Sequence, residues 1–131
     1  MKKLIFLLAF ALSACQADET LTGYGAADQT WTLQSIDGAA FTARADITFP
    51  SEGTIAGHAP CNSYGAQQTA PYPWFSASAL RATRAACPEL ALEQAFFAAL
   101  ADMTLAEVSG GVMILSNSEG REMVFKAGSA E

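Results

Sequence analysis

The sequence predicts an α+β domain in which an antiparallel sheet packs against one main helix. Several segments alternate apolar and polar residues, as a half-buried strand does, and short turn sequences separate two pairs of them. A single segment carries apolar residues at helical spacing. Because strands and helices do not alternate along the chain, a parallel sheet is not expected. The length of 131 residues fits one domain.

The first expected strand covers residues 30–36 and ends at the turn sequence Asp37-Gly38. The next two strands, 45–49 and 54–57, flank Pro50-Ser51-Glu52-Gly53, which is a typical turn sequence. These two strands therefore predict a hairpin.

The second half of the chain contains further expected strands. Residues 74–80 form a weaker candidate, and residues 103–108 are a candidate for one more strand. Residues 112–115 and 123–125 flank the polar turn Asn117-Ser118-Glu119-Gly120, so they predict a second hairpin.

The one expected helix covers residues 88–102. Pro88 suits the first helical position, and Glu89 suits the positive end of the helix dipole. We interpret the aromatic residues of this helix as core side chains and not as a cofactor platform. The apolar stripe expected to face the sheet consists of Leu92, Phe96, Phe97, Ala99 and Leu100.

The N-terminus has the features of an export signal in residues 1–14. Two lysines precede the apolar run Leu4–Leu12, which is too short to cross a membrane as a helix and is followed by small residues. The sequence Leu12-Ser13-Ala14-Cys15 resembles the lipobox of bacterial lipoproteins, which implies cleavage before Cys15 and lipidation of its thiol. The alternative is an ordinary secretory signal cut near Ala14 that leaves Cys15 as a free thiol.

The predicted mature chain begins with a lipidated flexible tether at residues 15–28, which is poor in large apolar side chains. A domain at 29–127 and a tail at 128–131 follow. Gln16 stands where an acidic residue would favour the inner membrane, so the resemblance implies the outer membrane, with the domain facing the periplasm. The formal charge of the mature chain is −8, and no basic run is present, so nucleic acid is not an expected partner.

Cys61 and Cys87 are the only cysteines left once Cys15 is acylated, and an exported chain meets an oxidising compartment. We therefore predict a disulfide between them, which would stabilise the fold by about 3.5 kcal/mol through chain entropy. A pair of buried thiols is the alternative.

No catalytic or metal-binding residue is assigned. His58, Cys61 and Cys87 could serve as zinc ligands, and His58 with Cys61 as a nucleophilic pair. Neither is expected, because the sequence has no second pair of Cys or His at ligand spacing and oxidation would consume both thiolates. We expect His58 to be a loop residue on the surface and Glu89 and Glu93 to lie on a solvated helix face. The sequence thus predicts a non-enzymatic protein without a metal or cofactor.

Four residues near the cysteines form a possible polar surface patch. The alternative interpretation is that they cap the helix and satisfy backbone groups of the loops. These residues are Asn62, Tyr64, Thr83 and Arg84.

Several linked segments over about residues 29–126 carry a further resemblance. They are Trp31-Thr32-Leu33 with Ile36-Asp37-Gly38, Ile55-Ala56-Gly57 with Cys61-Asn62-Ser63-Tyr64, Thr83-Arg84-Ala85-Ala86-Cys87-Pro88, then Glu93, Phe96 and Leu100, and finally Leu115, Gly120 and Phe125. In this order and spacing they resemble the META domain family, which includes the HslJ-type heat-inducible lipoproteins. Pro60 stands where the family usually has Gly, and Ala85 where it usually has Met.

This resemblance implies a curved, partly barrel-like antiparallel sheet packed on a helix, in a family associated with envelope stress, and it brings no established catalytic site. We expect a lipid-anchored envelope protein that acts as an interaction or stress-protection module. Its expected partners are the membrane, through the N-terminal lipid, and an unidentified envelope protein. The alternative is a small-ligand binder or hydrolase with a site near the loop from Cys61 to Tyr64.

Overall fold

A computed structural model describes residues 17–128 of the chain. The lipidation and signal predictions for residues 1–15 therefore lie outside the described residues. The elements, in chain order, are η1 (Leu21–Tyr24, a 3-10 turn), β1 (Trp31–Ile36), β2 (Ala39–Ala40), β3 (Asp46–Ser51), β4 (Thr54–His58), β5 (Ser63–Gln67), β6 (Ser78–Ala82), α1 (Leu90–Asp102), β7 (Leu105–Ser109), β8 (Val112–Ser116) and β9 (Glu122–Ala127).

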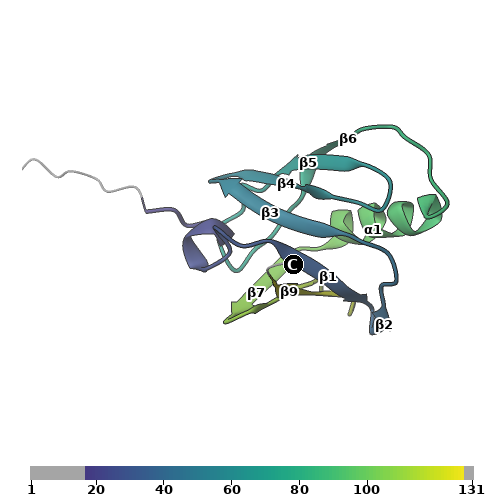
Figure 1. The fold of residues 1–131 in the computed structure, drawn as a ribbon. Coiled ribbons are helices and arrows are strands. Elements are labelled where there is room, and N and C mark those ends of the chain that lie inside the picture. Colours follow the sequence, from purple (N-terminus) through teal and green to yellow (C-terminus); the bar gives the residue numbers. More distant parts are fainter. Residues whose placement is uncertain (1–16, 129–131) are drawn as a thin grey trace, which may run out of the picture.

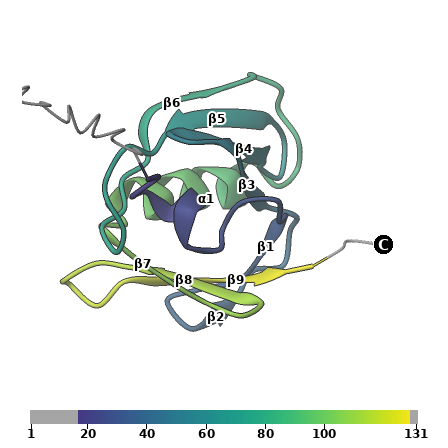
Figure 2. The ribbon, with the colours of Figure 1, turned by 90° about the vertical axis from the view of Figure 1, so that its left-hand side faces the viewer.

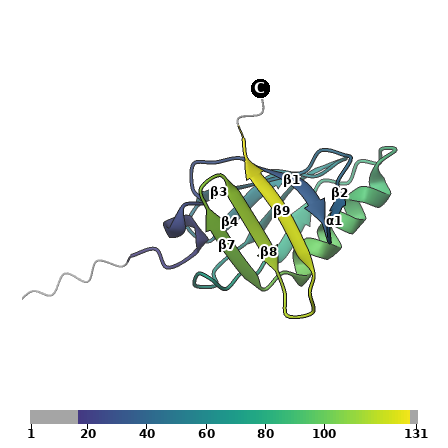
Figure 3. The ribbon, with the colours of Figure 1, turned by 90° about the horizontal axis from the view of Figure 1, so that it is seen from below.

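The strands form one antiparallel sheet in the order β6-β5-β4-β3-β1-β9-β8-β7, and the short β2 pairs with β1. The sheet curls into a half-barrel, and α1 lies in the space that it partly encloses (Figures 1 and 2). The β8–β9 hairpin and β7 form one wall of this half-barrel (Figure 3). The predicted α+β fold with a curved antiparallel sheet and one main helix is confirmed.

The core lies between the concave side of the sheet and α1. Alternate residues of each strand point to one face of a sheet, so Trp31 and Leu33 of β1 face the same side as Ile47 and Phe49 of β3. From α1, Phe96, Ala99 and Leu100 are buried, as the predicted stripe requires, while Leu92 and Phe97 are partly buried.

The two ends of the sheet are connected by the segment between β5 and β6. Trp74 pairs with Leu105 of β7, and the Phe75 N–H donates to the Thr104 carbonyl at 2.9 Å. The buried Gln68 holds this segment, because its Oε1 accepts from the Ser76 N–H at 2.7 Å. The strand expected at 74–80 is therefore divided into this bridge and β6.

The domain begins earlier than residue 29, which corrects the prediction of a tether at 15–28. Leu21 and Ala26 are fully buried in the core, and the Trp31 indole Nε1–H donates to the Ala26 carbonyl at 3.0 Å. Two buried residues five positions apart do not produce the periodic pattern of a strand or a helix, so the sequence did not reveal this part of the domain. At the other end, the last strand, β9, ends at Ala127.

Three further differences concern the start of the helix and two strands that were not expected. The helix begins at Leu90, not at Pro88, and the short strand β2 was not expected. Strand β5 was also not expected, because Gly65 and Ala66 make its apolar pattern weak.

Among residues 17–128, no helix is long and apolar enough to cross a membrane.

Candidate functional site

Cys61 and Cys87 form a disulfide, with their Cα atoms 5.5 Å apart. The bond joins the segment after β4 to the segment before α1. Both sulfur atoms are used in it, so neither is a thiolate that could act with His58 as a metal ligand or a nucleophile.

Asn62, next to the disulfide, is buried and has all four hydrogen-bonding positions of its amide occupied. Its Nδ2 donates to the Ala85 carbonyl at 3.0 Å and to Glu93 Oε2 at 2.7 Å. Its Oδ1 accepts from the Thr83 hydroxyl at 2.9 Å and from the Ala85 N–H at 2.7 Å. We call Asn62, Thr83, Ala85 and Glu93 the Asn62 cluster.

Glu93 connects this cluster to the helix. It is only 4% exposed, and its Oε1 accepts from the Cys61 N–H at 3.0 Å. The prediction of a solvated face for both helix carboxylates is therefore wrong for Glu93, because the loop around the disulfide covers the first turn of α1. Glu89 is exposed, as expected.

Tyr64 lies on the concave face of the sheet. Its hydroxyl donates to the Asp46 carbonyl at 2.8 Å, and its ring makes edge contacts with Phe96 and Phe97. Burial, together with the nearby Asp46 carboxylate, raises the pKa of Tyr64 well above its ordinary value. Gly57, its cross-strand neighbour, has no room for a side chain, since a Cβ atom there would lie 2.3 Å from the Asp46 carbonyl oxygen.

The four residues of the predicted polar patch do not form a common surface. Asn62 and Tyr64 are buried, whereas Thr83 and Arg84 are exposed. For Asn62 the structure agrees with the alternative interpretation, because its amide satisfies the backbone N–H and carbonyl of Ala85. The Thr83 hydroxyl donates to Asn62 Oδ1 and not to a backbone group.

A groove of about 650 Å³ lies on the other side of the sheet, over β1, β3, β4 and the start of β5. Because Ile47 and Phe49 point to the core, their neighbours Asp46 and Thr48 point to this face. A second groove of about 440 Å³ continues from it over β5 and β6 and shares Ala56, Ser63 and Tyr64 with it.

At one end of the larger groove, the nearly buried Asp46 carboxylate holds two basic side chains. Its Oδ1 accepts from the His58 N–H at 2.8 Å and lies 3.2 Å from the imidazole Nδ1, and Arg44 approaches Oδ2 at 3.4 Å. The imidazole is otherwise open to solvent, as predicted, but His58 is the last residue of β4 and not a loop residue. Ser63 is its direct cross-strand partner. The groove thus presents an oriented imidazole, a guanidinium and several hydroxyl groups.

Asp46 and Arg44 were not predicted from the sequence, because the register of the β3–β4 hairpin, which shifts between Thr48 and Ser51, decides what faces them. This register pairs Thr48 with Ala56, so two residues further along each strand Asp46 faces His58. Among residues 17–128, no group of three or more His, Cys, Asp or Glu side chains is arranged to hold a metal ion.

The model of the META domain family matches residues 20–130 of the chain. The chain belongs to the META domain family. No curated protein matches it.

Two solved structures share the fold of this META domain. An NMR structure of a protein from Burkholderia xenovorans has 24% identity and a TM-score of 0.64, with 82% of this chain and 87% of that chain covered. The crystal structure of a DUF4847 family protein from Bacteroides vulgatus has 13% identity and a TM-score of 0.64, with 82% and 98% covered. At these identities the likeness concerns the fold alone.

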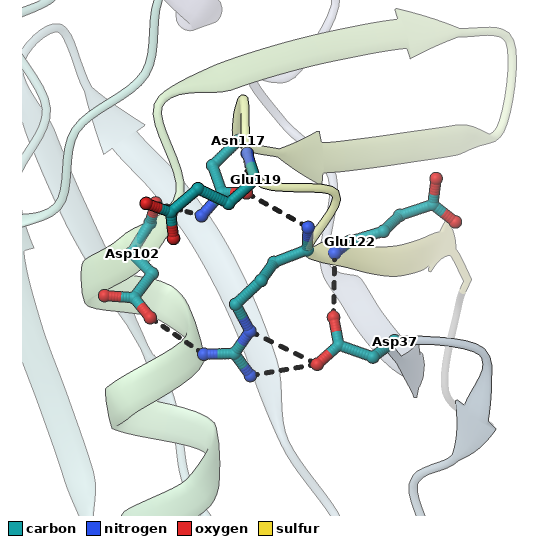
Figure 4. A network of polar contacts seen from close by, with 6 residues as sticks. Asp37, Asp102, Asn117, Glu119 and Glu122 are labelled. Atoms are coloured by element: carbon teal, nitrogen blue, oxygen red, sulfur yellow. Dashed lines mark hydrogen bonds and ion pairs between the residues drawn. The ribbon is translucent and has the colours of Figure 1, made fainter.

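A second polar cluster lies at the end of α1 that is opposite to the Asn62 cluster (Figure 4). Arg121 donates to Asp37 Oδ2 at 3.1 and 3.2 Å and to Asp102 Oδ2, at the end of α1, at 2.8 Å. The hydrogen bond from the Glu122 N–H, together with Arg121, holds the pKa of Asp37 below its ordinary value. These contacts connect the turn after β1, the end of the helix and the β8–β9 hairpin, so we assign them a structural role.

Proposed function

We propose that this META-domain protein is anchored in the cell envelope by a lipid on Cys15 and acts there, facing the periplasm, as a non-catalytic interaction or stress-protection module. The observation that carries this proposal is the disulfide between Cys61 and Cys87. Disulfides form and persist in oxidising compartments and are rare in the cytosol of most organisms. The disulfide therefore supports export, which is what the N-terminal signal and lipobox sequence predict.

The proposed anchor accounts for the residues before the domain. Two or three acyl chains hold a protein on a bilayer stably, whereas a single chain gives only marginal binding. Gln16 after the lipidated cysteine favours the outer membrane over the inner one. The proposed partner is an envelope protein, and the groove around Asp46 and His58 is the surface best suited to contact it, because its polar groups are oriented by a rigid sheet.

Metabolic labelling tests the anchor. Cells expressing the wild-type chain or Cys15→Ala are fed a radioactive fatty acid, and the membrane fraction is separated and examined for the protein. We expect a label on the wild type and none on the variant, with the variant lost from the membrane fraction. Equal labelling of both proteins would reject the proposal.

A small-ligand binder or hydrolase with a site near the loop from Cys61 to Tyr64 is a second candidate. The observation that favours it is the Asp46–His58 pair with Ser63 opposite the imidazole, in an open groove. For hydrolysis, the imidazole would act as a general base toward the Ser63 hydroxyl. Turnover of a panel of nitrophenyl esters should then be lost in both Ser63→Ala and His58→Ala and kept in Thr48→Ser, and no turnover by the wild type would exclude these esters as substrates.

A further inference from the structure

Exposed aromatic side chains gather at the end of the domain where the described chain begins. Tyr24, in η1, is 52% exposed, and Trp74 is 57% exposed. Tyr24 stacks on Tyr72, with ring centroids 4.5 Å apart, and Tyr72 stands two residues before Trp74. The Tyr72 N–H donates to the Glu19 carbonyl at 2.7 Å, which fixes this stack beside the first described residues. Figures 1 and 2 show η1 at this end of the molecule. We call Tyr24, Tyr72 and Trp74 the aromatic face.

The backbone below the aromatic face is held in place, so the exposure is built into the fold. The Tyr72 hydroxyl accepts from the Val108 N–H at 3.1 Å, and Trp74 is bridged to Leu105 of β7. Rings with an apolar body and a polar tip are enriched at the surface of membranes, where one end is apolar and the other is wet. The aromatic face therefore has the composition of a surface that contacts lipid headgroups.

The position of the proposed lipid limits the distance between this face and the bilayer. Cys15 precedes Glu19 by four residues, and an extended chain of that length spans at most about 14 Å. The headgroup layer on each side of a bilayer is itself roughly 5–8 Å thick. A lipid on Cys15 would therefore keep the aromatic face within reach of the headgroups.

We propose that the aromatic face rests on the headgroup region of the leaflet that holds the Cys15 lipid, and so fixes the orientation of the domain on the membrane. This inference rests on the proposed lipid anchor. Glu19 contacts Tyr72 of the face, Asp18 precedes it in the chain, and the mature chain has a formal charge of −8. Anionic lipid would therefore repel this end of the protein. The contact is with zwitterionic headgroups and depends on the aromatic rings.

Tryptophan fluorescence tests the contact in the full-length acylated protein, because the described residues contain one buried and one exposed tryptophan. Trp31 is fully buried in the core, whereas Trp74 belongs to the aromatic face. The protein is inserted into phosphatidylethanolamine–phosphatidylcholine vesicles that carry a nitroxide high on the lipid acyl chain, and flotation of the vesicles measures anchoring separately. The matched control combines Trp74→Phe with Leu80→Trp, which moves the reporter to another exposed apolar position, on β6.

In wild-type vesicles we expect quenching by the nitroxide and an acrylamide quenching constant at least about twofold lower than in detergent. The control protein should show neither effect. Flotation without nitroxide quenching would overturn the contact and leave the anchor standing, whereas failure to float would refute the anchor and the contact together. In detergent, Trp74 could instead be protected from acrylamide quenching, and this protection could disappear when the protein is diluted. That result would show that a second copy of the chain covers the aromatic face, and would also overturn the proposal.

Discussion

Replacing Glu93 by alanine is expected to destabilise the domain strongly. The carboxylate accepts from the Cys61 N–H at 3.0 Å and from the Asn62 side-chain amide at 2.7 Å, in a position that is only 4% exposed. Each donor that is left buried without an acceptor costs about 1–3 kcal/mol. Loss of one packed methylene adds about 0.8 kcal/mol. We therefore expect Glu93→Ala to lower the free energy of unfolding by about 3–7 kcal/mol.

Two further variants separate the hydrogen bonds from the helix itself. Glu93→Gln keeps the shape and one acceptor oxygen, so it should cost about 1–3 kcal/mol. Glu89→Ala, in the exposed residue four positions earlier, removes only a favourable interaction with the helix dipole and should cost at most about 1 kcal/mol. Urea unfolding followed by the emission of the buried Trp31 measures all three values. Equal effects of Glu93→Ala and Glu89→Ala would refute the role that we assign to Glu93.

Other predictions concern the disulfide, the crowded glycine and the buried phenol. Replacing both Cys61 and Cys87 by alanine removes a link across 26 residues and should cost about 3.5 kcal/mol, measured by the same urea titration under non-reducing conditions. An unchanged unfolding midpoint would contradict this. Gly57→Ala places a Cβ atom 2.3 Å from a backbone oxygen and should cost about 1–3 kcal/mol or more, whereas Gly111→Ala, which has open space around it, should be nearly neutral. Because the pKa of Tyr64 is raised in the folded state, its contribution is complete below the ordinary pKa of 10.0 and is lost above it. Stability should fall above pH 10 by up to roughly 1.4 kcal/mol per pH unit more in the wild type than in Tyr64→Phe, and equal slopes would exclude this explanation.

Local patterns were sufficient to predict most of the fold. The β3–β4 and β8–β9 hairpins follow from alternation and turn residues, and the helix follows from the spacing of Phe96 and Leu100. Strand β5 escaped prediction because Gly65 and Ala66 carry little apolar surface. Closure of the sheet by the segment around Trp74 depends on a partner strand more than 30 residues away and has no local signal.

The polar residues were harder to interpret than the apolar ones, for a physical reason. A carboxylate on a helix has the same sequence signature whether solvent or a loop covers it, so the burial of Glu93 depends on where residues 61 and 62 lie in space. The disulfide could be predicted because only two cysteines remained to be paired. The Asp46–His58 pair could not be predicted in this way, because a shift of register between Thr48 and Ser51 in the β3–β4 hairpin decides which residue faces Asp46.

The intact mass of the protein purified from the cell envelope without reduction tests the central claim most directly. The account predicts a chain that begins at Cys15, is heavier by a thioether-linked diacylglycerol and any further acyl chain, and is lighter by two hydrogens because of the bond between Cys61 and Cys87. A chain that still begins at Met1, recovered from the cytosol with all three cysteines open to alkylation, would contradict it.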